Sequence, residues 1–461
     1  MAERNTIYLC LAHMSEEGWE QKYVKEAFDT NWVVPLGPNV NGFEADLEAF
    51  VNPSLALPEG EGKRVVALSA GTAAVHLALK ACGVGPGDEV CVQSFTFCAS
   101  SHPITYLGAK PVFIDSERET WNMDPALLEM AIKDRIAKTG KKPKAIIPVA
   151  LYGMPYRMDE IMAIADRYEI PVIEDAAEGM GSLYKGQVLG TFGKYGVLSF
   201  NGNKMITTSG GGALICRNAE EANEIMWYAT QARDAYPYYQ HTAIGYNYRM
   251  SNVCAGIGRG QMKVLDAHIA HHKHVQGLYE QLLAGVPGIT VHKQSDVRCK
   301  TADGRDVPVF DSNYWLCTIT LDPDLRIQGQ ENAYKEVIKT AVGGAAGVIH
   351  QVESATTDCQ PNENVEALRV FMLGKKIEAR PVWKPMHKQP VYCAPLNDKG
   401  EIRTEKLADG VTCQTSGSSV AYVNGVSEEV FKVGMCLPAG PYVTDEDVRY
   451  IVACIKEAIE G

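Results

Sequence analysis

A chain of 461 residues is long enough to form more than one domain around a large buried core. Its 46% hydrophobic and 22% charged residues are ordinary for a globular protein, and its formal net charge of −12 argues against a nucleic-acid partner. No apolar run approaches the roughly 20 residues that cross a bilayer, and the N-terminus does not read as a secretory signal. The 13 scattered cysteines are typical of reduced thiols in a cytoplasmic protein.

The first half of the chain is expected to alternate between strands and helices. A helix over 16–29 and a Gly- and Pro-rich loop precede a second helix from about Phe43. The pattern then predicts strands at 65–68, 89–93, 110–115, 144–151 and 171–174 and a helix at 158–168. This alternation indicates an α/β fold with a doubly wound, mostly parallel sheet, in which ligands bind beyond the carboxyl ends of the strands.

One candidate anion site follows the first of these strands. Ser69, Ala70, Gly71 and Thr72 are small residues that open a helix. The free N–H groups and the dipole of such a helix start attract anions. Capping of the helix by the side chain of Ser69 or Thr72 would explain the same residues without a ligand.

Asp175 is expected at the carboxyl end of a buried strand, followed by Ala176, Ala177 and Glu178. A buried carboxylate requires a cation or several hydrogen-bond donors. Two interpretations are open here: Asp175 caps a helix, or it is the partner of a protonated ring nitrogen.

Lys204 lies in the stretch SFNGNKMITTSGGG (199–212), which carries no other charged residue. An amine held away from water loses part of its preference for the protonated form, and the neutral amine attacks carbonyl carbons. Lys204 is therefore either a Schiff-base lysine or a lysine on a loop before a strand.

A histidine-rich helix follows, with the sequence DAHIAHHKHV. His268 and His272 are four residues apart and could share one face of the helix. Because the arrangement H-E-x-x-H is absent and a lysine interrupts the cluster, we expect a polar helix face and no metal site.

The character of the chain changes at about residue 276. We expect an N-terminal segment with a large domain over 1–275 and a smaller α+β domain with polar insertions over 276–461. Helices are predicted at 279–283 and 331–342 and a strand at 315–321, whereas 360–365 and 397–425 are expected to be insertions or loops.

One ligand, an aromatic aldehyde with a phosphate group, would explain the spacing of these candidates: pyridoxal 5'-phosphate. Lys204 would bind the aldehyde carbon and later serve as the general base, and Asp175 would contact the ring nitrogen. Thr72, its helix start and Ser199 would hold the phosphate. Phe97 could stack on the ring, or it could be an ordinary core aromatic.

Several motifs also resemble those of one family. They are GTAAVHLAL, the pair Thr96-Phe97, EDAAEGMGS, SFNGNK, GYNYRMSN and GMCLPAG. They are similar, in the same order, to motifs of the DegT family of nucleotide-sugar aminotransferases, which are fold type I pyridoxal-phosphate enzymes. The resemblance extends from about Ile7 to the C-terminus. It implies a mostly parallel, seven-stranded-type sheet with flanking helices and a smaller C-terminal domain.

The resemblance also implies roles for individual residues. Lys204 matches the Schiff-base lysine, which excludes the dehydratase branch with histidine at this place. The GYNYR segment would reach the neighbouring subunit, through Asn247 and with Arg249 as a further candidate, and this implies a homodimer with shared sites. The implied cofactor-binding residues are Thr72, Ala73, Phe97, Asp175, Glu178, Ser199 and Asn247.

SFNGNK followed by ITTSGGG is most similar to the branch that acts on UDP-linked 4-keto-6-deoxy amino sugars, of the UDP-N-acetylbacillosamine type. The implied reaction moves an amino group from glutamate to the keto carbon and supplies a 4-amino sugar for surface glycans. Trp32, Tyr152 and His387 are candidates for the substrate side, although structural roles explain them equally well.

Three alternatives remain. The chain could be another pyridoxal-phosphate enzyme, such as a lyase, or a non-catalytic regulatory protein on the same fold. A cofactor-free nucleotide-binding protein is disfavoured, because the phosphate-loop pattern G-x-x-x-x-G-K-[ST] is absent.

Overall fold

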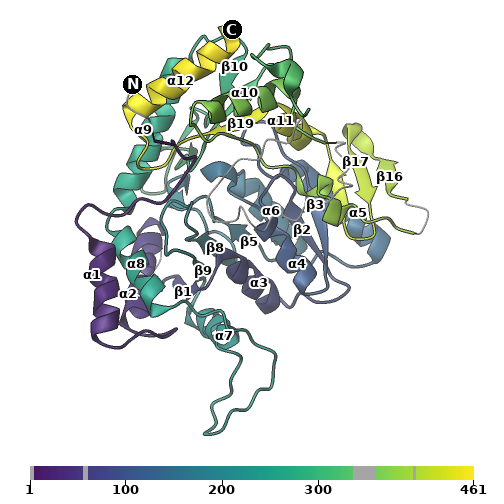
Figure 1. Ribbon diagram of the computed structural model, residues 1–461. Coiled ribbons are helices and arrows are strands. Elements are labelled where there is room, and N and C mark those ends of the chain that lie inside the picture. Colours follow the sequence, from purple (N-terminus) through teal and green to yellow (C-terminus); the bar gives the residue numbers. More distant parts are fainter. Residues whose placement is uncertain (1–4, 56–60, 336–358, 398–400, 461) are drawn as a thin grey trace.

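The computed structural model describes residues 5–55, 61–335, 359–397 and 401–460 (Figure 1). The strands of its largest sheet are β1 (Arg64–Leu68), β2 (Glu89–Gln93), β3 (Lys110–Ile114), β4 (Ala145–Ile147), β5 (Ile173–Asp175), β8 (Tyr195–Ser199), β9 (Gly212–Cys216), β16 (Arg403–Lys406), β17 (Thr412–Thr415) and β18 (Val420–Val423). They form two hydrogen-bonded groups, in the orders β1-β9-β8-β5 and β16-β17-β18-β3-β2-β4. Parallel bridges from Ile146 to Val172 and from Val149 to Asp175 join these groups into one sheet.

The central strands of this sheet are parallel. Strand β2 pairs in parallel with β3 and β4, β5 with β8, and β18 with β3. Antiparallel strands lie toward its two edges: β9 runs antiparallel between β1 and β8, and β17 between β16 and β18. The prediction of a mostly parallel α/β sheet is therefore confirmed.

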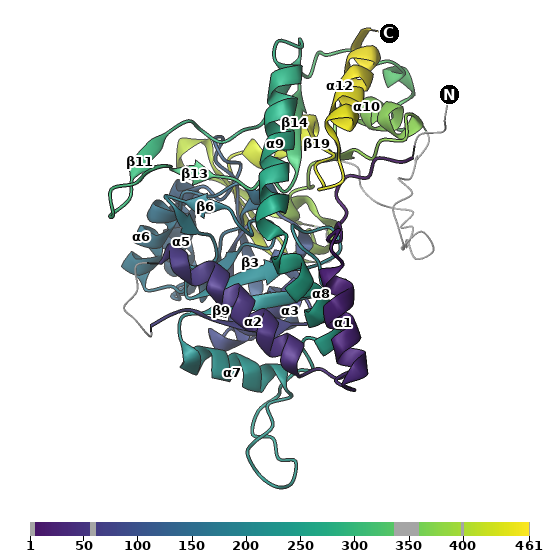
Figure 2. The same cartoon turned by 90° about the vertical axis from the view of Figure 1, so that its left-hand side faces the viewer.

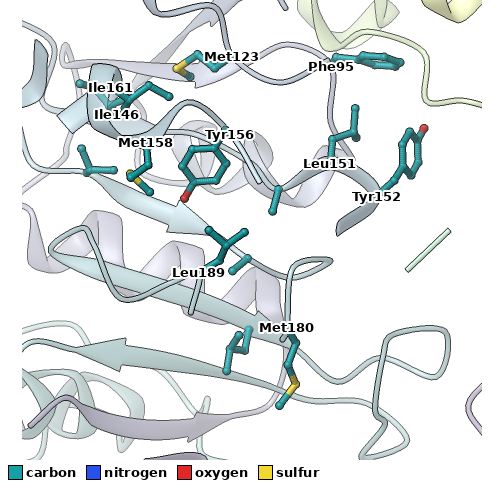
Figure 3. Close-up of a cluster of buried hydrophobic side chains, with 14 of the residues drawn as sticks. Phe95, Met123, Ile146, Leu151, Tyr152, Tyr156, Met158, Ile161, Met180 and Leu189 are labelled. Atoms are coloured by element: carbon teal, nitrogen blue, oxygen red, sulfur yellow. The ribbon is translucent and has the colours of Figure 1, made fainter. Parts of the chain in front are cut away.

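Helices cover both faces of the sheet. They are α2 (Pro38–Val51), α3 (Gly71–Ala81), α4 (His102–Tyr106), α5 (Pro125–Thr139), α6 (Met158–Tyr168) and α7 (Ala219–Ala229). Because alternate strand residues point to opposite faces, Val65 of β1 packs in one core with α2, α5 and α6, whereas Val66 packs in another with α3, α4 and α7. Figure 3 shows part of the first core, around Ile146, Tyr156 and Met158.

A second, smaller layer lies at the end of the molecule that holds the C-terminus (Figures 1 and 2). Its sheet has the order β10 (Ile289–Val291), β14 (Cys317–Leu321), β19 (Gly434–Leu437), β15 (Arg380–Pro381). Helices α9 (Leu265–Leu283), α10 (Glu363–Gly374) and α12 (Asp445–Glu460) pack against it and complete a third core.

The remaining elements lie around these layers. They are α1 (Trp19–Asp29), α8 (Asn252–Met262), α11 (Val426–Val433), β6 (Leu183–Tyr184), β7 (Gln187–Val188), β11 (Arg298–Lys300), β12 (Asp306–Pro308) and β13 (Phe310–Asp311). Helix α1 packs on α8. The 13 cysteines, which all lie among the described residues, form no disulfide with one another. Among the described residues, no helix combines the length and the apolar character that crossing a membrane requires.

Several predicted boundaries differ from the structure. Helix α2 begins at Pro38, before the predicted Phe43, because Gly37 and Pro38 suit a helix start. Strand β4 is shorter than the predicted 144–151, and Pro148, which follows it, has no N–H to donate. The predicted helix at 279–283 is the end of the longer α9.

Of the two predictions for 397–425, a loop is wrong, and an insertion stays a prediction. The residues described there, 397 and 401–425, include β16, β17 and β18, and β18 extends the large sheet next to β3. The domain division at residue 276 remains a prediction, although β18 lies on its C-terminal side and in the large sheet. The predicted helix at 331–342 lies largely outside the described residues, which include 331–335 but not 336–358.

Candidate active site

A cavity of about 440 Å³ opens at the carboxyl ends of β5 and β8. Its volume is in the range of small-molecule sites. The sequence-predicted residues that line it are Thr72, Phe97, Asp175, Glu178, Ser199 and Lys204. Two further predicted residues lie elsewhere: Ala73 is buried in the first turn of α3, and Asn247 borders a separate hollow beside Arg249 and Tyr239.

The start of α3 forms one end of the cavity. The residue at its N-cap position is Ala70, and no side-chain hydrogen bond caps the helix, so the capping interpretation of Ser69 and Thr72 is wrong. A Cβ atom on Gly71 would lie 3.0 Å from the Cβ of Ser199, which shows how closely β8 approaches the helix start. Uncapped N–H groups, the helix dipole and two neighbouring hydroxyls suit a phosphate group.

The side chain of Lys204 is turned away from solvent. Its side chain is only 11% exposed, and Nζ lies 3.1 Å from Oε1 of Glu178. Nζ also lies 3.9 Å from the ring centre of Trp315, which is a cation–π contact. The indole N–H of Trp315 donates to the carbonyl of Asn203 at 2.6 Å and so fixes the lysine-bearing turn. Lys204 does lie on a loop before β9, as one interpretation expects, but its amine is enclosed beside an acid and an aromatic ring.

Trp315 was not identified from the sequence. It comes from the segment before β14, far along the chain, and no motif marks it. Its role depends on α9 and β14 packing beside the large sheet, which a local pattern does not encode.

Glu178 joins Lys204 to the chain that follows β4. Its second oxygen, Oε2, accepts a hydrogen bond from the backbone N–H of Tyr152 at 2.8 Å. Burial raises the pKa of Glu178, while the charge of Lys204 and these hydrogen bonds oppose that rise.

Asp175 ends β5 and faces the same cavity. The hydroxyl of Ser100 donates to Oδ2 at 2.6 Å, and the N–H of Ala177 donates to Oδ1 at 3.1 Å. The next regular element is β6, so Asp175 is not a helix cap. Burial raises the pKa of Asp175, and a cation placed before it would lower that pKa again.

Phe97 is 50% exposed, and its ring centre lies 5.6 Å from that of Trp383. Both rings line the cavity. The alternative that Phe97 is a core aromatic is therefore wrong.

The three residues predicted as candidates for substrate contacts are not among those that line the cavity. Tyr152 is buried, and its hydroxyl accepts a hydrogen bond from the backbone N–H of Trp383 at 2.7 Å. His387 is buried and both of its ring nitrogens have protein partners, Ser94 and Glu428. Trp32 is 40% exposed and lies outside the residues that line the cavity. The structure favours structural roles for Tyr152 and His387.

Arg249 also has a partner within its own chain. Its guanidinium forms a buried ion pair with Glu44 and donates to the carbonyl of Ala67 at 2.9 Å. Asn247 pairs with Thr230 at the base of a loop that projects from the molecule beyond α7 (Figure 1).

His268 and His272 do not form a polar surface, contrary to expectation. Both are buried, and each Nδ1 contacts a backbone carbonyl, that of Met205 for His268 and that of Tyr314 for His272. Over the described ranges, no group of three or more His, Cys, Asp or Glu side chains is arranged to hold a metal ion.

The donor set of the cavity fits pyridoxal phosphate. It combines a buried lysine beside an acid, a second acid at a strand end, an exposed aromatic ring and an uncapped helix start. Together with a mostly parallel sheet covered by helices, these features define the class of fold type I pyridoxal-phosphate enzymes.

Comparison with known proteins specifies the class further. The sequence profile of the DegT/DnrJ/EryC1/StrS aminotransferase family matches residues 14–341, and the chain belongs to this family. It is 39% identical over 449 residues to EpsN of Bacillus subtilis (strain 168), whose name describes it provisionally as a pyridoxal phosphate-dependent aminotransferase; the match covers 97% of this chain and 94% of EpsN. It is 34% identical over 399 residues to GDP-perosamine synthase of Caulobacter vibrioides, covering 87% and 91% of the two chains.

A solved structure of similar fold is the DegT DnrJ EryC1 StrS aminotransferase from Brucella abortus. The TM-score is 0.74 at 24% identity, and 96% of each chain is covered. The protein is thus a pyridoxal-phosphate-dependent sugar aminotransferase, as the resemblance of its motifs predicts.

Proposed function

We propose that this enzyme transfers an amino group from glutamate to the keto carbon of a nucleotide-linked 4-keto-6-deoxy sugar, and that the resulting 4-amino sugar supplies surface glycans. The observation that carries the proposal is the buried Lys204–Glu178 pair inside a cavity whose other end suits a phosphate. The similarity to GDP-perosamine synthase over most of both chains supports a nucleotide-linked sugar as the acceptor.

In this proposal, some residues of the cavity bind the cofactor and others take part in proton transfer. The N–H groups of Thr72 and Ala73 and the hydroxyl of Ser199 would hold the phosphate, and the carboxylate of Asp175 would accept a hydrogen bond from the ring nitrogen. Phe97 would stack on the ring. The bound cofactor supplies an electron sink for the carbon that gains or loses the amino group.

Lys204 is the group that moves the proton. As the general base, the amine of Lys204 would take a proton from the donor carbon and would deliver one to the acceptor carbon. Glu178 keeps Nζ in place through their hydrogen bond and offers a negative charge to its protonated form.

We also propose a cytoplasmic homodimer with shared sites, in which Asn247 reaches the phosphate of the neighbouring subunit. Among the described residues that line the cavity, Lys204 is the only cationic side chain, yet the cofactor and both substrates are anionic. The projecting loop beyond α7 exposes Tyr236, Tyr238, Tyr239 and Ile244, which suits burial against a second copy.

The absorption spectrum of the purified protein tests the proposed amino transfer from glutamate. A violet-region band that moves to shorter wavelength with glutamate supports the proposed donor, and addition of a nucleotide-linked keto sugar should restore the band. A band that ignores glutamate contradicts the donor and favours a lyase. No band after addition of pyridoxal phosphate would overturn the proposal and leave the regulatory alternative.

A further inference from the structure

The side chain of Trp383 is one of those that line the active-site cavity. The same side chain, with Phe97 and Thr96, also lines a neighbouring hollow of about 360 Å³. Trp383 belongs to residues 380–392, here called the Trp383 segment. This segment begins in β15 of the small sheet and ends at Tyr392, which is buried in a core of the large sheet.

The Trp383 segment is held at the end of β2 by Ser94. The carbonyl of Ser94 accepts the N–H of Met386 at 2.8 Å, and its hydroxyl oxygen accepts the N–H of His387 at 3.3 Å. The same hydroxyl lies 2.6 Å from Nδ1 of the His387 ring. Since its oxygen already accepts a backbone N–H, the Ser94 hydroxyl is free to donate its proton to Nδ1.

The other ring nitrogen of His387 contacts Glu428. An ionised carboxylate only accepts hydrogen bonds, so Nε2 carries a proton and donates it to Oε1 of Glu428 at 3.1 Å. In the uncharged ring Nδ1 is then the acceptor of the Ser94 hydroxyl proton. Although burial opposes it, the hydrogen bond from His387, the charge of that ring when it is protonated, and the charge of Lys388 lower the pKa of Glu428 to about 2. Glu428 therefore remains an anionic acceptor over the working pH range.

Glu428 is itself tied to the large sheet. It lies in the first turn of α11, and the carboxylate of Asp115, which follows β3, accepts the N–H groups of Gly425 and Ser427 at the start of that helix. Ser94, His387 and Glu428 thus connect the ends of β2 and β3 to a segment that comes from the small sheet.

The order Glu428–His387–Ser94 resembles a hydrolase triad, but the serine is inaccessible. Ser94 is 1% exposed, and its hydroxyl is occupied by His387 on both the donor and acceptor sides. A nucleophile must reach its substrate, so this network holds structure and performs no hydrolysis.

We propose that Ser94, His387 and Glu428 form a positioning network that fixes Trp383 against Phe97 and thereby sets the affinity for the sugar substrate. The inference rests on the proposed function, because it concerns the acceptor that would contact these two rings where they line the cavity and the neighbouring hollow. Glutamate is much smaller than a nucleotide sugar and would make fewer contacts with them. Loss of the network should therefore weaken the binding of the sugar and leave the reaction with glutamate nearly intact.

The test compares the two substrates in one set of variants. In His387→Gln and Glu428→Ala, we expect the Kd of a nucleotide-sugar probe, UDP-N-acetylglucosamine or GDP-mannose, to rise about tenfold, as expected for loss of a buried hydrogen bond. The rate of the spectral change with glutamate should stay within about twofold. Glu428→Gln keeps an acceptor oxygen for Nε2–H and should restore the affinity.

The control is His274→Gln, which removes an exposed contact with Asp445 far from the cavity and should change neither reading. Unchanged probe affinity in His387→Gln and Glu428→Ala, or an equal loss in both readings, would overturn the positioning role. Calorimetric titration of the probe is independent of amino transfer. A parent enzyme that ignores glutamate would thus contradict the proposed function, while the network would still be judged by probe affinity alone.

Discussion

Nζ of Lys204 lies 3.1 Å from Oε1 of Glu178, and the other oxygen of the same carboxylate accepts the backbone N–H of Tyr152. One buried acid therefore holds both the amine that we propose to be catalytic and the chain that follows β4. The pair joins residues 26 positions apart in the sequence. Neither partner is substantially exposed, so solvent does little to weaken their attraction.

Glu178→Gln should slow catalysis without abolishing the binding of pyridoxal phosphate. A hydrogen bond to a charged group contributes about 1.5–3 kcal/mol, so we expect the single-turnover rate with glutamate to fall roughly 10- to 100-fold. Stopped-flow absorption measures this rate. Tyr152→Phe is the matched control, because it keeps the N–H bond to Glu178 and removes only the hydroxyl. Equal rates in Glu178→Gln and the parent would contradict a role for Glu178 in holding Lys204.

Ser100→Ala should make the stability of the apoenzyme more sensitive to pH. Burial raises the pKa of Asp175 above its usual 3.8, while the Ser100 hydroxyl lowers it, so removing Ser100 raises the pKa further. The folded chain then holds the proton more tightly than the unfolded chain. Stability falls as the pH rises from about 3.8 through the raised pKa, and it falls further in the variant.

We expect Ser100→Ala to lose about 1–3 kcal/mol of unfolding free energy at neutral pH and less at pH ~4, measured by denaturant titration of the apoenzyme. In an Asp175→Asn background the same substitution should lose this pH dependence. A loss that is equal at both pH values would show that Ser100 acts through packing and not through the Asp175 charge.

Gly212→Ala should disrupt the end of the cavity at the start of α3, where we propose that the phosphate binds. A Cβ atom at Gly212 would lie 2.3 Å from the backbone nitrogen of Gly71, so the start of α3 must shift. We expect the Kd of pyridoxal phosphate to rise at least tenfold, as measured by equilibrium dialysis. Gly210→Ala is the control, since its Cβ would meet nothing within 4 Å. Equal affinities in the two variants would argue against α3 as the phosphate-binding helix.

Glu174→Gln should destabilise the fold although the residue adjoins Asp175. Glu174 is fully buried and accepts hydrogen bonds from Tyr156 Oη at 2.8 Å and from the N–H groups of Gly190, Phe192 and Gly193. An amide NH₂ directed at these donors leaves them unsatisfied, and we expect a loss of about 3 kcal/mol or more in denaturant unfolding.

Tyr156→Phe removes only one of those donors and should cost about 1 kcal/mol. If Glu174→Gln were no more destabilising than Tyr156→Phe, the backbone donors would contribute little. The two neighbouring acids thus separate into a structural Glu174 and a cavity-facing Asp175, because successive residues of β5 point to opposite faces of the sheet.

Much of the architecture could be predicted locally. The strands at 89–93 and 110–114 and helix α6 follow from apolar runs and helical spacing that survive in the structure. The strands at 403–423 could not be predicted in this way. Strand β16 is wholly exposed, and the polar residues 416–419 separate β17 from β18, so no apolar pattern marks these strands. They exist because the edge of β3 offers β18 a row of backbone partners.

By itself, the sequence determined the class of fold and the main chemical groups of the site, since Lys204, Asp175, Glu178 and the start of α3 lie in short motifs whose chemistry is local. The tertiary structure alone decided which partners surround them. Trp315 beneath Lys204, Ser100 on Asp175, and His387 held between Ser94 and Glu428 all join distant parts of the chain. Such contacts depend on how the helices and the small sheet pack against the large one, and packing of distant elements leaves no periodic signal in the sequence.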